Sequence, residues 1–195
     1  MLKQDIVLAT NNRHKQREIS HFFSQKVLIP EDLGVTFEIE ESATTFVGNA
    51  LLKAQALYQL TGKATLADDS GLVIEALPHI LGVHSARFAP QMSQEEKNEH
   101  VIDLMRGVVN RQAYFVCAMV LYHQQESFIS VQSTWIGSIA HEVKGNNGFG
   151  YDAIFKLEDG RHVAQLSAEE KAQCSHRAKA LNKLNHWFHS NEDGG

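Results

Sequence analysis

The feature that most constrains the fold of this chain is its longest apolar run, Tyr114 to Tyr122. The run is about half as long as a membrane-spanning helix must be, so it predicts a buried strand and no membrane span. Two more strand-like segments, Ser127–Trp135 and Ile136–Val143, follow it without a helical signal between them. Consecutive strands joined by short connections pair antiparallel, and we therefore expect a three-stranded meander here.

The rest of the chain alternates between strand and helix signals. Strands are expected at residues 6–9, 27–29, 65–67 and 72–77, and helices from residue 15, over residues 46–60, over residues 94–106, from residue 168 and at the C-terminal end. Thr44 or Thr45 is the expected N-cap of the second helix, and capping boxes at Ser93 and Ser167 begin two others. This alternation predicts an α/β fold with a mixed β-sheet flanked by helices.

Length and charge narrow the class of protein. A chain of 195 residues without an evident linker is expected to form one domain, 1–195. The net charge of −5 disfavours nucleic acid and anionic membrane as partners, but a small phosphorylated ligand needs only a few cations in one place. The polar start of the chain has no signal-peptide pattern, and the 2 cysteines form no CxxC, so we expect a cytoplasmic protein.

The polar stretch after the first strand is a candidate phosphate-binding loop. It contains Thr10, Asn11, Asn12, Arg13, His14 and Lys15. Backbone N–H groups at the start of a helix favour anions, and two cationic side chains strengthen that preference. No P-loop motif is present, and taken alone the segment also fits a polar loop that only caps a helix.

Carboxylates follow the strand at residues 65–67, in the motif Asp68-Asp69-Ser70-Gly71. Adjacent carboxylates repel each other unless a cation is near, and Mg²⁺ accepts one or two of them together with phosphate oxygens. Glu40 and Glu41 could complete such a site. A turn with solvated acidic residues is the alternative, although the apolar segments on both sides of the motif weaken it.

Two later segments have the composition of a ligand site. Gly148-Phe149-Gly150-Tyr151-Asp152 combines glycines, which let a ligand approach the backbone, with aromatic rings that can stack on a base. Lys171 and the run Ser175-His176-Arg177 place hydrogen-bond donors near the start of the last helix. A glycine-rich hairpin and a solvated helix cap remain the alternatives for these two segments.

In this order, the motifs resemble the inosine/xanthosine triphosphate pyrophosphatase family along nearly the whole chain. The matching segments are Thr10-x-Asn12-x-x-Lys15, Phe46…Asn49-Ala50…Lys53-Ala54, Asp68-Asp69-Ser70-Gly71-Leu72, Ser85-Ala86-Arg87-Phe88, Gly148-Phe149-Gly150-Tyr151-Asp152, and Lys171 with Ser175-His176-Arg177. The resemblance implies an elongated mixed sheet with two lobes around a central nucleotide-binding cleft, in a homodimer. It also implies Mg²⁺-dependent hydrolysis of ITP, dITP and XTP to the nucleoside monophosphate and pyrophosphate.

The resemblance also implies roles for single residues. The Thr10–Lys15 loop and Lys53 would hold the triphosphate, Asp69 would act as general base or metal ligand, and Glu40 would help to bind Mg²⁺. The base and sugar would be surrounded by Ser70, Phe149, Gly150, Tyr151, Asp152, Lys171, His176 and Arg177. The donors among them suit a 6-oxo purine, because the 6-amino group of adenine would leave them unpaired.

The chain departs from the family's common pattern at three positions. Gly48 stands where an acidic residue is frequent, Ala153 where proline is usual, and Cys174 where an apolar residue is typical. Two other functions remain open: a pyrophosphatase for modified pyrimidine or methylated nucleotides, and a nucleotide sensor without turnover. The acidic pair and the lysines favour turnover, since a protein that only binds nucleotide has less need of clustered metal-binding acids.

Overall fold

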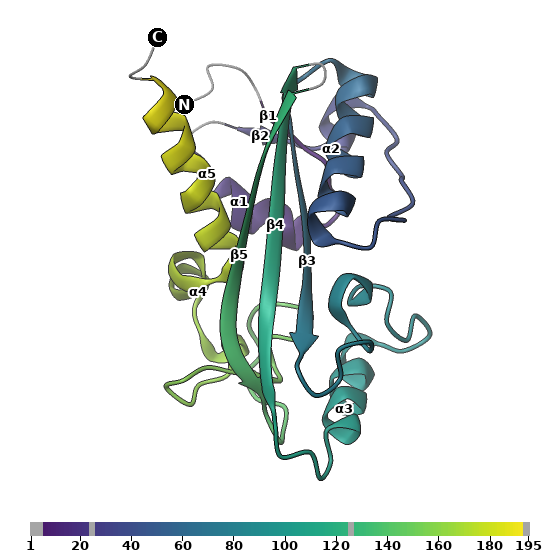
Figure 1. Ribbon diagram of the computed structural model, residues 1–195, viewed down its shortest axis with the longest axis vertical. Helices are drawn as coiled ribbons and strands as arrows, with labels where there is room; N and C mark the ends of the chain where they lie inside the picture. The colour runs from purple at the N-terminus through teal and green to yellow at the C-terminus, as the bar shows by residue number, and fades with distance from the viewer. Residues whose placement is uncertain (1–5, 24–25, 125–126, 193–195) are drawn as a thin grey trace. The chain divides into compact units, whose positions relative to one another are not determined.

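The protein is described by a computed structural model, which covers residues 6–23, 26–124 and 127–192, with side chains as far as Trp187 (Figure 1). Six strands form one sheet: β1 (Ile6–Leu8), β2 (Val27–Leu28), β3 (Thr65–Ile74), β4 (Gln112–Gln124), β5 (Ser127–Ile139) and β6 (Phe155–Lys156). Their order is β2-β1-β3-β4-β5-β6. Because β1 is parallel to β2 and β3 while β6 is antiparallel to β5, the sheet is mixed, as predicted.

Five α-helices accompany the sheet: α1 (Arg13–Ser20), α2 (Phe46–Thr61), α3 (Gln94–Leu104), α4 (Ala168–Cys174) and α5 (His176–Glu192). Short 3₁₀ segments occur at Pro30–Leu33, Gly82–His84 and Val163–Gln165. The α/β class predicted from the sequence is confirmed. Among the described residues, no helix combines the length and apolar character that crossing a membrane demands.

The helix ends follow the predicted caps. The Thr45 hydroxyl accepts a hydrogen bond from the N–H of Gly48 at 3.0 Å and begins α2, which ends at Gly62 with a φ of 65°. Both predicted capping boxes are present, with Ser93 and Ser167 as the caps of α3 and α4. Local hydrogen bonding therefore sets where these helices start.

The strands differ from the prediction. Residues 65–67 and 72–77, expected as separate strands, belong to the one strand β3, so the acidic motif lies inside a strand and not at its end. The expected strands at residues 127–135 and 136–143 are likewise one strand, β5, and the three-stranded meander was wrong. Gly137 does not mark a turn. A Cβ at this position would lie 2.5 Å from Phe155 Cε1, so the glycine lets β6 approach β5 closely.

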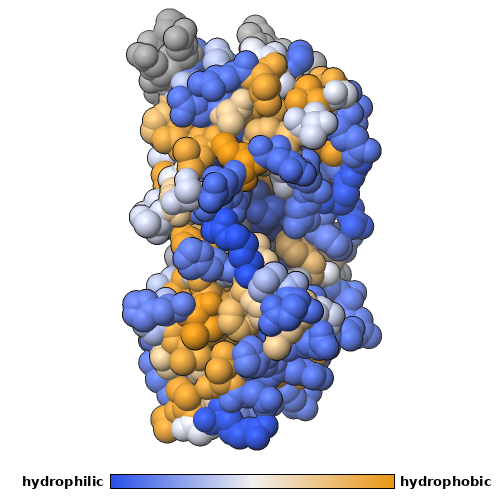
Figure 2. Space-filling view, turned by 90° about the vertical axis from the view of Figure 1, so that its right-hand side faces the viewer, coloured by the Kyte–Doolittle hydropathy of each residue, from blue (hydrophilic) through white to orange (hydrophobic). Residues whose placement is uncertain are grey.

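The chain divides into two compact units. The first contains the chain up to Asp69, Cys117–Ser133 and the chain from His176 onward, and the second contains Ser70–Val116 and Thr134–Ser175. Strands β3, β4 and β5 contribute residues to both. The expectation of one domain over residues 1–195 stays a prediction. On the face shown in Figure 2, hydrophilic and hydrophobic residues are interspersed.

In the first unit, strand alternation builds a core on each face of the sheet. One core joins Leu8 and Leu66 to residues of α1 and α5, including Ile19 and Leu181. The other joins Ala67 and neighbouring strand residues to Ala50, Ala54 and Leu57 of α2. Helices α1 and α5 thus cover one face and α2 the other (Figure 1). By the same alternation, Asp68 faces α1 and α5, and Asp69 faces α2.

The second unit has a core of its own. Leu72 and Ile74 of β3 pack there with Val101 and Met105 of α3. The ring of Phe155 lies 4.5 Å from that of Phe115 and 6.2 Å from that of Trp135, measured between centroids. This core supports the segment between β5 and α4, which contains the glycine-rich loop.

Candidate active site

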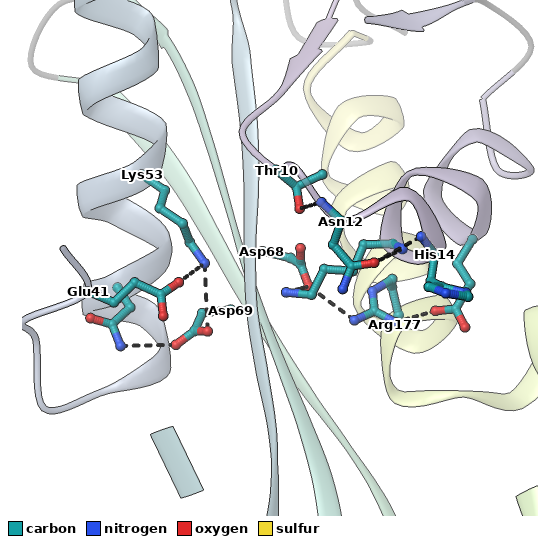
Figure 3. A network of polar contacts seen from close by, with 11 residues as sticks. Thr10, Asn12, His14, Glu41, Lys53, Asp68, Asp69 and Arg177 are labelled. Atoms are coloured by element: carbon teal, nitrogen blue, oxygen red, sulfur yellow. Dashed lines mark hydrogen bonds and ion pairs between the residues drawn. The ribbon is translucent and has the colours of Figure 1, made fainter. Parts of the chain in front are cut away.

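Asp68 lies at the centre of a buried ion cluster on the α1/α5 face of β3 (Figure 3). Its Oδ2 is 3.0 Å from Lys15 Nζ and 3.2 Å from an amino nitrogen of Arg177. Arg177 also pairs with Glu18 of α1. Burial opposes the charge on Arg177, but the carboxylates of Asp68 and Glu18 outweigh it and raise the pKa of the guanidinium above its ordinary value.

This cluster ties α1 and α5 to β3. Two cations, Lys15 and Arg177, meet two carboxylates, Asp68 and Glu18, so its formal charge is balanced. The guanidinium of Arg177, expected beside the base, is engaged with these carboxylates. His176 is the first residue of α5 and is also buried. Glu18 was missed in the sequence, although its place one turn after Lys15 on the predicted helix was the available signal.

The Thr10–Lys15 loop forms the start of α1. Asn12 is the N-cap, and its Oδ1 accepts hydrogen bonds from the N–H groups of His14 at 2.9 Å and Lys15 at 3.3 Å. Thr10 Oγ1 accepts from the N–H of Asn12 at 3.1 Å. Within the part of the chain that the structure describes, the N–H groups of Asn11 and Arg13 have no such partner. They are available to an anion.

The remaining side chains of the loop point elsewhere. Asn11 Nδ2 donates to the carbonyl of Phe37 at 2.9 Å, which fixes the loop against the segment before α2. Arg13 is exposed and pairs with Glu31, and His14 is exposed on α1. Of the two cations predicted here, Lys15 faces the buried carboxylate and Arg13 faces the surface.

On the opposite face of β3, Asp69 belongs to a second cluster (Figure 3). Lys53 Nζ, from α2, lies 2.5 Å from Glu41 Oε1 and 3.7 Å from Asp69 Oδ1. Asn49 Nδ2, also from α2, donates to Asp69 Oδ2 at 3.1 Å. Asp68 and Asp69 therefore point away from each other, and the interpretation of them as one carboxylate pair facing a shared cation was wrong.

The second cluster carries an excess of negative charge, since one ammonium faces two carboxylates. Burial raises the pKa of Asp69, and Glu41 raises it further while Lys53 opposes the rise. Burial alone would lower the pKa of Lys53, but the carboxylates of Asp68, Asp69 and Glu41 outweigh it, so that pKa is raised as well. Both shifts describe a site with too few cations for its carboxylates.

The predicted metal ligands divide between contact and surface. Asp69 is buried in the cluster, whereas Glu40 is exposed, and Glu41 is the glutamate that contacts Lys53. Nowhere in residues 6–23, 26–124 and 127–192 do three or more His, Cys, Asp or Glu side chains gather as a metal-binding group. The protein alone offers two carboxylates, which is how Mg²⁺ is commonly held when substrate phosphates supply further ligands.

In the second unit, the glycine-rich loop and Lys171 form a third cluster. Lys171 Nζ lies 2.6 Å from Asp152 Oδ2 and 4.5 Å from the centroid of the Phe149 ring. The same Asp152 oxygen accepts the N–H of Phe149 at 2.9 Å. The structure thus brings together three of the residues predicted to surround the base. Ser70 follows Asp69 in β3 and is half-buried.

Contacts from elsewhere in the second unit hold this loop. Asn98 of α3 donates to the carbonyl of Gly150 at 3.2 Å, and the buried Tyr151 hydroxyl donates to the carbonyl of Ser85 at 3.0 Å. The carbonyl of Ala153 is bound by the N–H of Lys144 and the ring of His162. A pocket of about 450 Å³ beside the loop is lined in part by Asn98, Phe149 and Asp152.

Comparison with known proteins gives the family. The model of the Ham1 family matches residues 6–187, nearly all of the described chain. The chain belongs to the Ham1 family. The family resemblance predicted from the ordered motifs is confirmed.

Individual relatives agree over most of their length. The dITP/XTP pyrophosphatase of Treponema denticola is 40% identical over 182 residues, covering 90% of this chain and 94% of the relative. That of Nitrosomonas europaea is 41% identical over 194 residues, covering 96% and 95%. The Ham1 protein of Staphylococcus aureus has the same fold as this Ham1 family protein, with a TM-score of 0.87 at 35% identity over 96% of this chain and 100% of that one.

Proposed function

We propose that this protein hydrolyses dITP, ITP and XTP to the nucleoside monophosphate and pyrophosphate, with Mg²⁺ as cofactor. The observation that carries the proposal is the likeness, at 40% identity over most of both chains, to a relative named dITP/XTP pyrophosphatase. The contact of Asp69 with Lys53 and Asn49 supplies the corresponding chemistry. Removal of such nucleotides from the cellular pool would be its role.

The triphosphate is assigned to the start of α1 and to the lysines. The N–H groups of Asn11 and Arg13, the partial positive charge of the helix start and the nearby ammonium of Lys15 together favour phosphate oxygens. Lys53 adds an ammonium beside Asp69. Attack at the α-phosphorus makes pyrophosphate the leaving group, and ammonium groups stabilise the charge that grows on it.

Asp69 is assigned as the general base that takes the proton from the attacking water. Its raised pKa makes its carboxylate a stronger base than an exposed aspartate, while the carboxylate is still ionised near neutral pH. Asn49 and Lys53 hold its two oxygens from one side. General-base catalysis is worth about 10²–10⁴ in rate, so charge neutralisation and positioning must supply the rest.

Asp69 and Glu41 are the carboxylates of the structure that fit Mg²⁺, and Glu40 is retained from the sequence as a further candidate. The negative charge excess of this cluster is the observation in favour of a cation. When bound, Mg²⁺ would neutralise phosphate oxygens and acidify a bound water.

Recognition of the base is assigned to Phe149, Asp152 and Lys171. Phe149 offers a ring for stacking, and Lys171 offers a donor for a 6-oxo group. An adenine would present a 6-amino group to that donor and leave it unpaired, at a cost of about 1–3 kcal/mol per unpaired group. The pocket beside Phe149 and Asp152 is of a size that suits a small ligand.

The test is a hydrolysis assay with Mg²⁺ on ITP, dITP, XTP, GTP, ATP and dUTP, with pyrophosphate and orthophosphate measured separately. We expect pyrophosphate from the first three and little product from ATP or GTP. Orthophosphate release would contradict attack at the α-phosphorus. A preference for dUTP would indicate the pyrimidine function, and binding without product would indicate a sensor.

We further propose that the protein is a single-domain homodimer in the cytoplasm, as the family resemblance implies and as the location of free nucleotides favours. Sedimentation velocity over a range of concentrations tests the dimer, because a monomer would sediment at half the expected mass throughout.

A further inference from the structure

Asn49 joins the segment that carries Glu41 to the strand that carries Asp69. Its side chain has no exposed surface, and its Oδ1 accepts the N–H of Ala43 at 2.9 Å. Its Nδ2 donates to Asp69 Oδ2 at 3.1 Å. Residues 41–44, here called the strap, precede the N-cap of α2. One amide group therefore spans the distance between the strap and β3.

The hydrogen-bond chemistry explains why this position carries an amide. The N–H of Ala43 can only donate, so the amide oxygen must face the strap, and the amino group is then turned toward Asp69. An aspartate at position 49 would have no donor for Asp69, and an alanine would leave both partners without this contact. Asn49 thus fixes which Asp69 oxygen receives a donor and leaves the other toward Lys53.

Gly48, the neighbour of Asn49, lets the strap lie against α2. A Cβ at residue 48 would be 2.8 Å from Ala43 Cβ and 2.9 Å from Thr45 Oγ1, closer than real Cβ contacts come. Ala43 Cβ is fixed to the backbone, so the strap itself would have to move. Gly48 has an ordinary helical backbone, and its missing side chain is what the close approach requires.

The seating of the strap determines where Glu41 lies. Glu41 precedes Ala43 by two residues, and its Oε1 is 2.5 Å from Lys53 Nζ, the atom that lies 3.7 Å from Asp69. We propose that Asn49 is a positioning residue for Asp69, and that Gly48 and Asn49 together seat the strap that brings Glu41 to Lys53. This inference rests on the proposed function, in which Asp69 is the base.

Three variants test it: Asn49→Ala, Gly48→Ala and, as the matched control, Gly62→Ala at the other end of α2. Alanine favours a helix over glycine, so on helix stability alone Gly48→Ala would be harmless. Gly62 has a φ of 65° with no atom within 4 Å of an added Cβ, so Gly62→Ala strains only the helix end.

We expect Asn49→Ala and Gly48→Ala to lower kcat by about tenfold to a hundredfold, as loss of an outer-shell partner commonly does. The KM for ITP should stay within about threefold, since the phosphate and base contacts are untouched. Gly62→Ala should lower the Tm and keep kcat within about twofold of the wild type. Crystal structures of the wild type and Asn49→Ala should show the Asp69 carboxylate and the strap displaced in the variant.

The inference would be overturned by full kcat in Gly48→Ala and Asn49→Ala, or by an equal loss in Gly62→Ala, which would reduce the effect to helix stability. An unmoved Asp69 carboxylate in the Asn49→Ala crystal would also overturn it. If the wild type releases no pyrophosphate from ITP, dITP or XTP, the proposed function fails instead, and the crystal comparison still decides what Asn49 positions.

Discussion

Asp68 and Asp69 are neighbours in the chain but have different surroundings. Asp68 is paired with two buried cations, Lys15 and Arg177, so its negative charge is needed for the fold. Asp69 shares Lys53 with Glu41, and burial raises its pKa, so its negative charge is held at a cost. One residue stabilises the structure, and the other is available for chemistry.

Substitution of the two residues should therefore have opposite effects. Asp69→Asn should lower kcat by about 10²–10⁴ and leave the Tm close to that of the wild type, because it removes the base and relieves a costly charge. Asp68→Asn should lower the free energy of unfolding by about 3–5 kcal/mol, because it leaves buried cations uncompensated. Thermal melts and initial rates of both variants check this, and full activity in Asp69→Asn would disprove the assignment of the base.

Tyr151 gives a stability effect that depends on pH. Burial raises the pKa of its hydroxyl to about 12, whereas an unfolded tyrosine ionises near 10. Below pH 10 the hydroxyl is neutral in both states, and its contribution to stability is fully present. As the pH rises from about 10 to about 12, the unfolded chain ionises first and the contribution is lost.

Tyr151→Phe removes this dependence together with the hydrogen bond to Ser85, worth about 1 kcal/mol. We expect the wild type to be more stable than the variant at pH 8, and the difference to shrink between pH 10 and 12. Urea unfolding at several pH values measures it. A difference that stays constant with pH would mean that Tyr151 ionises normally in the folded protein.

At the scale of elements, the loop between β5 and α4 is built around one close contact. Gly148 has a φ of 76°, and a Cβ there would lie 2.1 Å from Asp152 Oδ2, the oxygen that binds Lys171 and the N–H of Phe149. A side chain at this position would therefore push Asp152 away from both partners.

Gly148→Ala should consequently raise the KM for ITP several-fold, and Gly160→Ala is its control. Gly160 also has a positive φ, of 87°, but an added Cβ would meet no atom within 4 Å. Both variants bear the strain of alanine in the left-handed region, about 1–2 kcal/mol, so their Tm values should fall by similar amounts. An equal KM for the two variants would separate the loop from substrate binding.

The helices were predictable because their signals are local. Thr45, Ser93 and Ser167 cap helices through hydrogen bonds to residues three positions ahead, and Gly62 ends α2. The extent of β3 was not predictable, because three polar residues in its middle resemble a turn. Asp68 and Asp69 can be buried only because Lys15, Lys53 and Arg177 arrive from distant parts of the chain, and that convergence has no local signal.

The candidate site was predictable as a set of residues and less so as a set of contacts. Motif order identified Lys53, Asp69, Phe149, Asp152 and Lys171, and each lies in one of the charged clusters of the structure. The partners that orient them, Asn49 and Asn98, were not singled out. A buried amide on a helix looks like any other polar residue in the sequence until the atoms it contacts are known.

At the scale of the whole molecule, the two units carry different tasks. The carboxylates and lysines assigned to phosphate and metal lie in the first unit, apart from Ser70, and the loop assigned to the base lies in the second. Each unit has its own apolar core, so neither depends on a metal ion for its packing.

Removal of divalent cations should therefore abolish activity and leave the fold intact. We expect EDTA to stop pyrophosphate release and to change the Tm very little, because the cation is expected on two carboxylates and the substrate rather than in a structural cluster. Differential scanning fluorimetry with and without EDTA, alongside a Mg²⁺ titration of the rate, measures both. A large fall in Tm would point to a structural metal.

The opposite orientations of Asp68 and Asp69 also restrict how the gene can change. Successive side chains of a strand alternate between its faces, so loss or gain of one codon ahead of this pair would exchange them. The carboxylate needed by Arg177 would then face Lys53, and the base would be buried under α1. Substitutions can accumulate around β3, but its length up to Asp68 is fixed, and we expect insertions and deletions among relatives to fall outside it.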